Sequence, residues 1–321
     1  MKTRLLLWTL LVLFSAGDAS ARVVILSSVD GGPWLNDTAI YPLKGQRVVL
    51  KATDMPEGNV RWYQIFPDIS KFYKNAAYPW EENAYQWTGF DKIDYHREEL
   101  SSFQGQREIC PFENQTSGTD RSPYYHNDVG SFRFQAEVEN KGRSESSPGI
   151  GESDERGLSP KVFRVSIRDG QGYLGYLTSF FNVPGLFGSL PYQSGNYIGA
   201  DCADVLMAAY NRYKGQITAK DYNVAMLVGK FPKIEEFEIT EGIPDKSVRW
   251  GHIRPGDFIA VRYQSGRQYQ HIGALVADSD SDGILGPGDL ILHAGPFPLC
   301  YSYLKEGSFD GHVRILRPDI K

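Results

Sequence analysis

Apolar and polar residues alternate along parts of the front half of the chain with the period of a β-strand. Residues 131–138 read Ser-Phe-Arg-Phe-Gln-Ala-Glu-Val, and residues 161–167 read Lys-Val-Phe-Arg-Val-Ser-Ile. A period of two predicts strands that bury one face and expose the other. Shorter apolar runs bounded by Gly, Pro or Asp predict further strands, at residues 23–26, 47–50 and 59–63.

Together these strands predict an all-β N-terminal domain over residues 22–169, a β-sandwich of immunoglobulin-like kind. The Cys…Trp…Cys spacing of true immunoglobulin domains is missing. Residues 66–126 are rich in Tyr, Trp and Phe but show no sustained period. We expect this aromatic insertion to pack on its own sandwich, and contact with a saccharide or with the second domain is the alternative. Residues 141–157 are polar and rich in Gly and Ser, which predicts a mobile loop.

The pattern changes in the back half of the chain. Residues 201–215 predict a helix for which Asp201 is a candidate N-cap, and a second helix is expected at residues 218–228. Apolar segments then predict short strands at residues 257–261, 270–276 and 290–293. Helices followed by antiparallel strands are typical of an α+β domain, here over residues 170–321.

The first residues of the chain have the order of a signal peptide. Lys2 and Arg4 precede the apolar stretch 5–14, and small residues follow with Ala19 and Ala21 at the cleavage positions. An apolar stretch this short does not span a bilayer, which needs about 20 residues. We therefore expect residues 1–21 to be removed and the protein to be exported, to a periplasm or to the medium. The alternative is a buried helix of the fold.

Composition and charge narrow the classes of function. The 321 residues suffice for two domains, and 41% of them are hydrophobic. A formal net charge of −5 without basic clusters excludes nucleic acid as an expected partner. The three cysteines, Cys110, Cys202 and Cys300, are too few for a disulfide scaffold, although a Cys110–Cys300 bridge is conceivable.

One cysteine and two histidines form a candidate catalytic set. Cys202 falls in the first turn of its predicted helix, where unpaired N–H groups and the helix dipole favour a thiolate. His271 and His293 fall on two successive predicted strands, so they are expected to be neighbours across a hairpin. A thiol, a base and a third group that holds the base make a usable triad. Taken singly, a cysteine at a helix start and a histidine in a strand are more often structural.

Four segments resemble the NlpC family of bacterial cell-wall cysteine peptidases. These segments are residues 197–204, 253–258, 271–273 and 291–294, which read Tyr-Ile-Gly-Ala-Asp-Cys-Ala-Asp, Ile-Arg-Pro-Gly-Asp-Phe, His-Ile-Gly and Ile-Leu-His-Ala. The resemblance covers roughly residues 190–320 and implies a papain-like fold. It also implies hydrolysis of the stem peptides of peptidoglycan, with no cofactor for the chemistry.

The resemblance implies a role for each matching residue. Cys202 would be the nucleophile, His271 the general base and His293 the residue that orients it. Asp201 would help to bind a free amino group of the substrate, and we expect Tyr197 and Tyr192 beside it to contribute to substrate binding.

The match departs from the family at one position. The family pattern Asp-Cys-Ser-Gly is Asp-Cys-Ala-Asp here, which places the carboxyl of Asp204 one turn from the thiol. A charge there would raise the pKa of the thiol, unless the side chain points away to cap the helix.

The segment between the two histidine strands has the spacing of a calcium loop. Acidic residues occupy positions 1, 3, 5 and 12 of residues 278–289, and Gly283 occupies position 6. The expected ligands of a structural Ca²⁺ ion are four carboxylates and one backbone carbonyl: Asp278, Asp280, Asp282, Asp289 and the carbonyl of Ile284. The alternative is a solvated acidic hairpin loop.

These features predict an exported cysteine hydrolase that cleaves amide bonds, with peptidoglycan or a peptide as its substrate. A cysteine amidase that acts on a different amide is one alternative. A second alternative is a wall-binding or glycan-binding protein on an inactive papain-like scaffold.

Overall fold

The structure is a computed structural model and describes residues 23–113, 122–264 and 266–320. The predicted signal peptide, residues 1–21, lies outside the described residues. Helices make up 13% of the chain and strands 36%, which confirms the expected mixture of helix and sheet.

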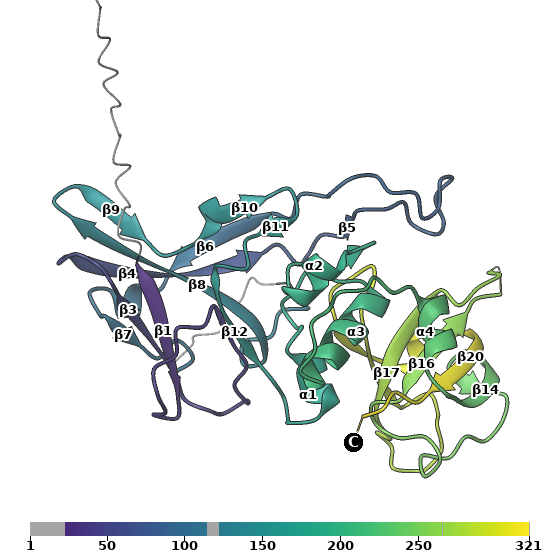
Figure 1. Cartoon of the computed structure of the whole chain (residues 1–321). Helices are drawn as coiled ribbons and strands as arrows, with labels where there is room; N and C mark the ends of the chain where they lie inside the picture. The colour runs from purple at the N-terminus through teal and green to yellow at the C-terminus, as the bar shows by residue number, and fades with distance from the viewer. Residues whose placement is uncertain (1–22, 114–121, 265, 321) are drawn as a thin grey trace, which may run out of the picture.

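The N-terminal half is built from two packed β-sheets (Figure 1). One sheet has the strand order β2-β12-β8-β4-β6, with β9 paired to β8, and the other has the order β1-β3-β7. The strands of the two sheets are β1 (Val24–Val29), β2 (Ala39–Ile40), β3 (Val48–Thr53), β4 (Asn59–Pro67), β6 (Tyr95–Glu99), β7 (Glu108–Ile109), β8 (Gly130–Asn140), β9 (Arg143–Ser146) and β12 (Phe163–Ile167). Large apolar side chains fill the space between the sheets, with Leu50 from one side and Trp62 and Phe132 from the other.

Strand β8 has an environment that its alternating sequence does not indicate. Its apolar residues face the sandwich core, but Ser131, Arg133 and Gln135 are buried as well, whereas the polar residues near the end of the strand are partly buried or exposed. The Ser131 hydroxyl donates to the carbonyl of Ser179 at 2.9 Å, and the Arg133 guanidinium donates to the carbonyl of Tyr197. The prediction of a half-buried strand is therefore wrong for the first half of β8, where the second face is covered by other segments, and it holds toward the end of the strand.

The polar segment 141–157 is folded, which corrects the prediction of a mobile loop. It contains β9, a 3₁₀ turn η2 (Ile150–Glu152) and the short pair β10 (Ser153–Asp154) and β11 (Gly157–Leu158). The Ser147 hydroxyl accepts the backbone N–H of Ala136 at 3.0 Å and ties the segment to β8. Hydrogen bonds to neighbouring strands, which composition does not encode, order this segment.

The C-terminal half packs helices on a seven-stranded antiparallel sheet of order β15-β14-β20-β16-β17-β18-β19. Its elements are α1 (Tyr173–Thr178), β13 (Leu186–Phe187), α2 (Pro191–Gly195), α3 (Cys202–Tyr213), α4 (Val224–Lys230), β14 (Lys233–Thr240), β15 (Ile243–Pro244), β16 (Phe258–Arg262), β17 (His271–Ala277), β18 (Leu290–His293), β19 (Cys300–Tyr303) and β20 (Gly311–Leu316). Helices α1 and α3 lie between the sandwich and this sheet (Figure 1). Helix α4 begins later than predicted, because the Asn223 side chain accepts the N–H of Met226 and caps it there.

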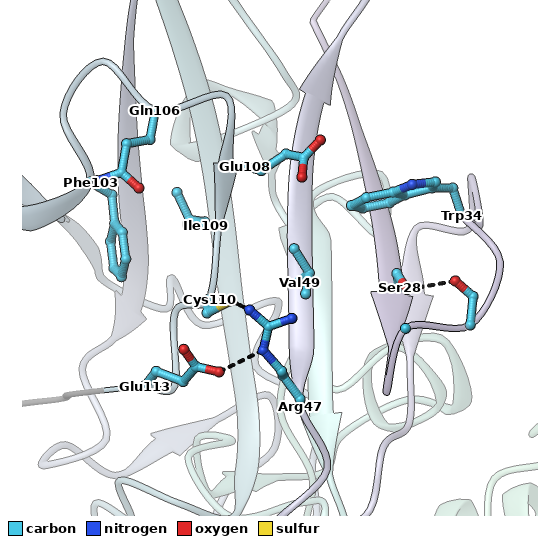
Figure 2. Close-up of a pocket in the computed structure, with 12 residues that line it drawn as sticks. Ser28, Trp34, Arg47, Val49, Phe103, Gln106, Glu108, Ile109, Cys110 and Glu113 are labelled. Atoms are coloured by element: carbon cyan, nitrogen blue, oxygen red, sulfur yellow. Dashed lines mark hydrogen bonds and ion pairs between the residues drawn. The ribbon is translucent and has the colours of Figure 1, made fainter.

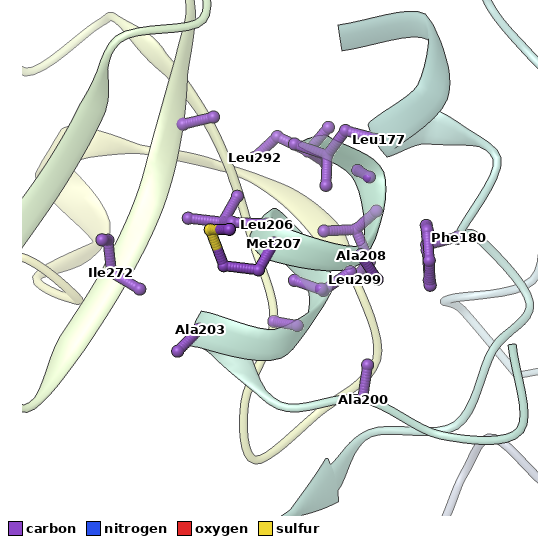
Figure 3. Close-up of a cluster of buried hydrophobic side chains, with 14 of the residues drawn as sticks. Leu177, Phe180, Ala200, Ala203, Leu206, Met207, Ala208, Ile272, Leu292 and Leu299 are labelled. Carbon is purple, nitrogen blue, oxygen red and sulfur yellow. The ribbon is translucent and has the colours of Figure 1, made fainter. Parts of the chain in front are cut away.

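Helix α3 forms the centre of the core that joins the two halves. Its Leu206 and Met207 face Ile272 and Leu292 of the sheet, while Ala208 lies on the opposite side (Figure 3). The packing sets the start of α3 against strand β17, and these two elements carry Cys202 and His271.

Candidate active site

Cys202 is the first residue of α3, and the preceding residue fixes the start of this helix. One carboxylate oxygen of Asp201 accepts the N–H groups of Ala203 and Asp204 at 3.0 and 2.9 Å. This is the capping role predicted for Asp201. The cap sets the orientation of the Cys202 side chain, whose sulfur accepts from the backbone N–H of Ile272, the residue after His271.

The two predicted histidines are hydrogen-bonded to each other. His271 Nε2 lies 2.8 Å from His293 Nδ1, across strands that pair Gly273 with His293. His293 Nε2 in turn lies 2.7 Å from the hydroxyl of Ser302 on β19. The expected hairpin neighbours are confirmed. Sequence reasoning missed Ser302, because a lone serine carries no motif and only the pairing of β18 with β19 reveals it.

These contacts allow an arrangement of protons that leaves one nitrogen of His271 free to accept a proton. If His293 Nε2 donates to Ser302, then His293 Nδ1 accepts from His271 Nε2. The remaining nitrogen of His271, Nδ1, is then the unprotonated atom. His271, His293 and Ser302 are all buried, so each polar atom needs a partner and the chain of three holds His271 in one orientation.

Both the thiol and the imidazole rings are neutral in this site. Burial lowers the pKa of His271 to about 4, and burial followed by the charge of His271 lowers the pKa of His293 well below its usual value. Burial, and after it the charge of Asp201, raises the pKa of the Cys202 thiol. The expected preference for a thiolate at the helix start is therefore wrong for the free protein, since burial outweighs the helix end.

Cys202 lies where two cavities meet. The first, here called the histidine cavity, has a volume of about 350 Å³ and is lined by His271, Tyr263 and Gly295 beside Cys202 and Asp201. The second, here called the acidic cavity, measures about 370 Å³, and Asp221 and Tyr222 line it together with the same Asp-Cys pair. A bound chain can thus extend from the sulfur in two directions.

The acidic cavity has the chemistry to receive a cation. Asp201 and Asp221 both line it, and burial followed by neighbouring carboxyls raises the pKa of Asp201 to about 6. Two carboxyls beside each other favour a positively charged partner, because it relieves their mutual repulsion. Sequence reasoning missed Asp221, which lies in the loop before α4.

The aromatic insertion forms a wall of both cavities. Tyr78 and Trp80 line the histidine cavity, and Tyr85 and Trp87 line the acidic cavity. We call these four residues the aromatic wall. The expectation that the insertion packs only on its own sandwich is therefore wrong, and the alternative of contact with the second domain is confirmed. Strand β5 (Tyr73–Lys74) pairs in parallel with β13, and this pairing attaches the insertion to the C-terminal half.

The unusual carboxyl of Asp204 is buried behind the Asp-Cys turn. It accepts the Ser189 hydroxyl at 2.6 Å, and the same hydroxyl accepts the backbone N–H of Asp201 at 3.2 Å. Burial, followed by the charge of Asp201, raises its pKa well above the usual value. Burial thus favours the protonated form of Asp204, and the residue that caps the helix is Asp201, not Asp204.

The two tyrosines expected to bind substrate lie elsewhere. Tyr197 is only 1% exposed, because its ring stacks on Phe180 at 3.9 Å and under the guanidinium of Arg164 at 4.0 Å. Its assignment to substrate binding is corrected, since these contacts fill both faces of the ring. Tyr192 is exposed and packs against Arg156, outside the residues that line the two cavities.

Three of the predicted calcium ligands converge. The carboxylate oxygens of Asp278, Asp280 and Asp282 lie within 4.8 Å of one another. One oxygen of Asp278 is buried and has no hydrogen-bond partner within the described part of the chain. The backbone N–H of Ile284 donates to Asp282 at 2.7 Å, which ties the main chain at this predicted ligand to the cluster. Oxygen atoms in this arrangement fit a hard cation.

The structure corrects the prediction that Asp289 is a calcium ligand. It is buried, and its two oxygens accept the N–H groups of Ser279, Gly286 and the Trp250 indole at 2.9 to 3.0 Å. These bonds already close the ends of the loop. Asp289 therefore holds the loop together and lies apart from the three converging carboxylates.

All three cysteines are free, which corrects the conceivable Cys110–Cys300 bridge. Cys110 lies in a separate cavity of the sandwich, where the guanidinium of Arg47 contacts its sulfur at 3.1 Å and Glu113 at 2.8 Å (Figure 2). Cys300 lies on β19 opposite His293.

The chain matches no protein-family model, no curated protein and no solved structure. Within the described ranges, no helix is both long and apolar enough to cross a membrane.

Proposed function

We propose that this protein is an exported cysteine hydrolase that cleaves amide bonds in the stem peptides of peptidoglycan. The observation that carries the proposal is the position of Cys202 and His271 on one cavity, with His271 held by His293 and Ser302. The motifs shared with the NlpC cell-wall peptidases supply the substrate class, together with a papain-like fold for the catalytic half and an immunoglobulin-like one for the sandwich.

The neutral thiol and imidazole define the first step of the reaction. As the Cys202 sulfur forms a bond with the amide carbon, its proton moves to His271 Nδ1. The imidazolium then donates this proton to the leaving amine while the carbon–nitrogen bond breaks. Water attacks the resulting thioester, His271 takes a proton from that water, and the thiol is restored. His293 and Ser302 keep His271 in the required tautomer and orientation throughout.

The acidic cavity would determine which way round the peptide substrate binds. Asp201 and Asp221 would bind an amino group of the peptide on that side of the sulfur. The role of Asp201 agrees with the one that the family resemblance implies, and Asp221 adds a second carboxyl.

A calcium ion is part of the proposal as a structural element of the hairpin between β17 and β18. Asp278, Asp280 and Asp282 would hold it, together with the Ile284 carbonyl of the predicted ligand set. The ion would stabilise the strands that carry His271 and His293, and it has no part in the bond cleavage.

Export is proposed from the order of residues 1–21. Sequencing of the mature protein from its native host should give an N-terminus at or near Arg22. A mature protein that keeps residues 1–21 in the cytoplasm would contradict export.

Digestion of purified peptidoglycan, followed by mass spectrometry of the released fragments, tests the activity. The wild type should release peptides with one new terminus, and Cys202→Ala should release none although it is folded. A thiol-reactive amide analogue should label Cys202 in the wild type. No release and no labelling would favour the binding-protein alternative, and labelling without release would favour another amide as substrate.

A further inference from the structure

The aromatic wall exposes large rings at the mouth of the active-site cavities. Trp80 is 69% exposed, Tyr85 58% and Trp87 47%. Soluble proteins seldom expose several large aromatic side chains together unless that surface binds something. The wall lies on a long loop that reaches from the sandwich over the catalytic half (Figure 1).

The loop that carries the wall is held in place by buried polar contacts. Asn75 is fully buried, and its side-chain amide donates to the carbonyl of Gly188 at 3.1 Å and to the side chain of Gln193 at 2.8 Å. The carboxylate of Glu81 accepts the N–H of Tyr78 at 2.9 Å and pairs with the ammonium of Lys74. The rings are therefore preorganised, so binding orders little additional chain.

The wall combines a flat apolar face with unpaired polar atoms. The rings of Tyr78 and Trp80 stack with centroids 4.7 Å apart and planes 8° apart. The Tyr78 hydroxyl and the side-chain oxygen of Gln270 are buried, and among the described residues neither has a hydrogen-bond partner. A purely apolar ligand would leave both groups unsatisfied, whereas a ligand with hydroxyl groups can pair with them.

The charged residues that line the histidine cavity restrict the chemical class of the ligand further. Among the residues that line it, Asp201 is the single carboxyl, and Lys and Arg are absent. The cavity therefore suits a neutral ligand that presents C–H groups to a ring and hydroxyl groups to polar atoms. A pyranose sugar has this combination.

We propose that Tyr78 and Trp80 form a carbohydrate subsite that binds a sugar ring of the glycan attached to the stem peptide. The inference rests on the proposed function and deepens it. The sandwich half thereby contributes to substrate recognition, because its insertion places the sugar beside the amide held at Cys202. The amino group of the peptide lies on the other side of the sulfur, at Asp221.

The test compares one stem peptide in two forms, free and linked to its disaccharide. Wild-type kcat/KM should be higher for the linked form. Trp80→Ala should lower kcat/KM about tenfold for the linked form and leave the free peptide within about twofold. Tyr78→Phe should lower kcat/KM only for the linked form, and by a smaller factor than Trp80→Ala. Trp34→Ala, an exposed tryptophan of the sandwich cavity, is the matched control and should change neither.

If Trp80→Ala loses kcat/KM equally on both substrates, or loses none on either, the proposed subsite is refuted. Circular dichroism and the melting temperature should confirm that each variant is folded, since Trp80 is largely exposed. If the wild type cleaves neither peptide, the proposed activity fails, and a β-1,4-linked N-acetylglucosamine tetrasaccharide then tests the subsite alone. Its binding should change the tryptophan fluorescence of the wild type but not of Trp80→Ala, and no binding to the wild type would refute the subsite.

Discussion

At the scale of single residues, the site depends on a buried row of polar groups behind the nucleophile. His271, His293 and Ser302 satisfy one another, so removing any member leaves a buried donor or acceptor unpaired. The members differ in their distance from the reacting atoms. In the proposed mechanism only His271 exchanges a proton with Cys202, and the other two act through it.

Substitutions along this row should therefore have graded effects on kcat/KM. His271→Ala should lower it by a factor on the order of 10³, His293→Ala by less, and Ser302→Ala by about tenfold. Ser302→Thr should restore most of the activity because it keeps the hydroxyl. The Cys202/His271 double variant should be little worse than either single variant. Cys110→Ala is the control. Equal losses of kcat/KM for His293→Ala and Cys110→Ala would contradict the positioning role proposed for His293.

Asp204 provides a second test at this scale. Because burial favours the protonated form of its carboxyl, the neutral isostere in Asp204→Asn should keep kcat within about threefold and leave the pH profile of kcat/KM unmoved. Asp204→Leu should be far more damaging, since the Ser189 hydroxyl would lose its acceptor. A shift of the pH profile in Asp204→Asn would show instead that Asp204 carries a charge that the thiol senses.

At the scale of elements, the hairpin of β17 and β18 joins the proposed metal loop to the catalytic histidines. The loop leaves β17 at Ala277 and enters β18 at Leu290, so an ion bound between them acts directly on both strands. Asp289 closes the loop through three N–H groups, whereas Asp278, Asp280 and Asp282 bring negative charges together. A cation would relieve their repulsion.

Calcium should therefore raise the melting temperature. At a free concentration a hundredfold above Kd, binding adds about 2.7 kcal/mol to the free energy of unfolding, which corresponds to a shift on the order of 5 °C. Calorimetry in chelator and in excess Ca²⁺ measures it. Asp280→Asn should reduce the shift, and Asp37→Asn, an exposed carboxyl of the sandwich, should keep it. Identical transitions with and without calcium would exclude the ion.

At the scale of the whole molecule, the two halves share one core. Val129 of the sandwich joins α1, α3 and the C-terminal sheet in a single cluster, and Arg133 and Arg164 reach across to backbone carbonyls of the other half. The buried rings of His271 and His293 lie next to this core and contact Phe309 of the neighbouring cluster. Their pKa values consequently couple the stability of the fold to pH.

The free energy of unfolding should fall in acid. His271 titrates near 6.5 in the unfolded chain and near 4 in the fold. Between these values the unfolded state binds more protons, so stability is full above about pH 6.5 and decreases toward pH 4, by on the order of 3 kcal/mol. Urea unfolding from pH 7.5 to 4.5 measures this slope, and His271→Gln should flatten it because Gln does not titrate. Parallel slopes in the two proteins would contradict the assignment.

Local sequence patterns were sufficient to predict several of the main strands, helix α3 and the segments that carry the candidate site. Periodicity predicted β8 and β12, a short apolar run predicted β4, and a capping residue followed by an apolar helical face predicted α3, because all of these depend on neighbours along the chain. The Asp-Cys turn, the two histidine strands and the acidic loop between them also follow from local spacing. The hydrogen bond between His271 and His293 confirms that the expected pairing was right.

Only the tertiary structure decided the environment of each group. Burial raises the pKa values of Cys202 and Asp204 and removes Tyr197 from the site, and buried hydrogen bonds hold Asp289 at the ends of the loop. Strand pairing between distant segments supplies Ser302 and places the aromatic wall, in residues with no period of their own, beside the nucleophile. These properties depend on solvent exclusion and on contacts between residues far apart in sequence, which a local pattern of apolar and polar positions does not contain.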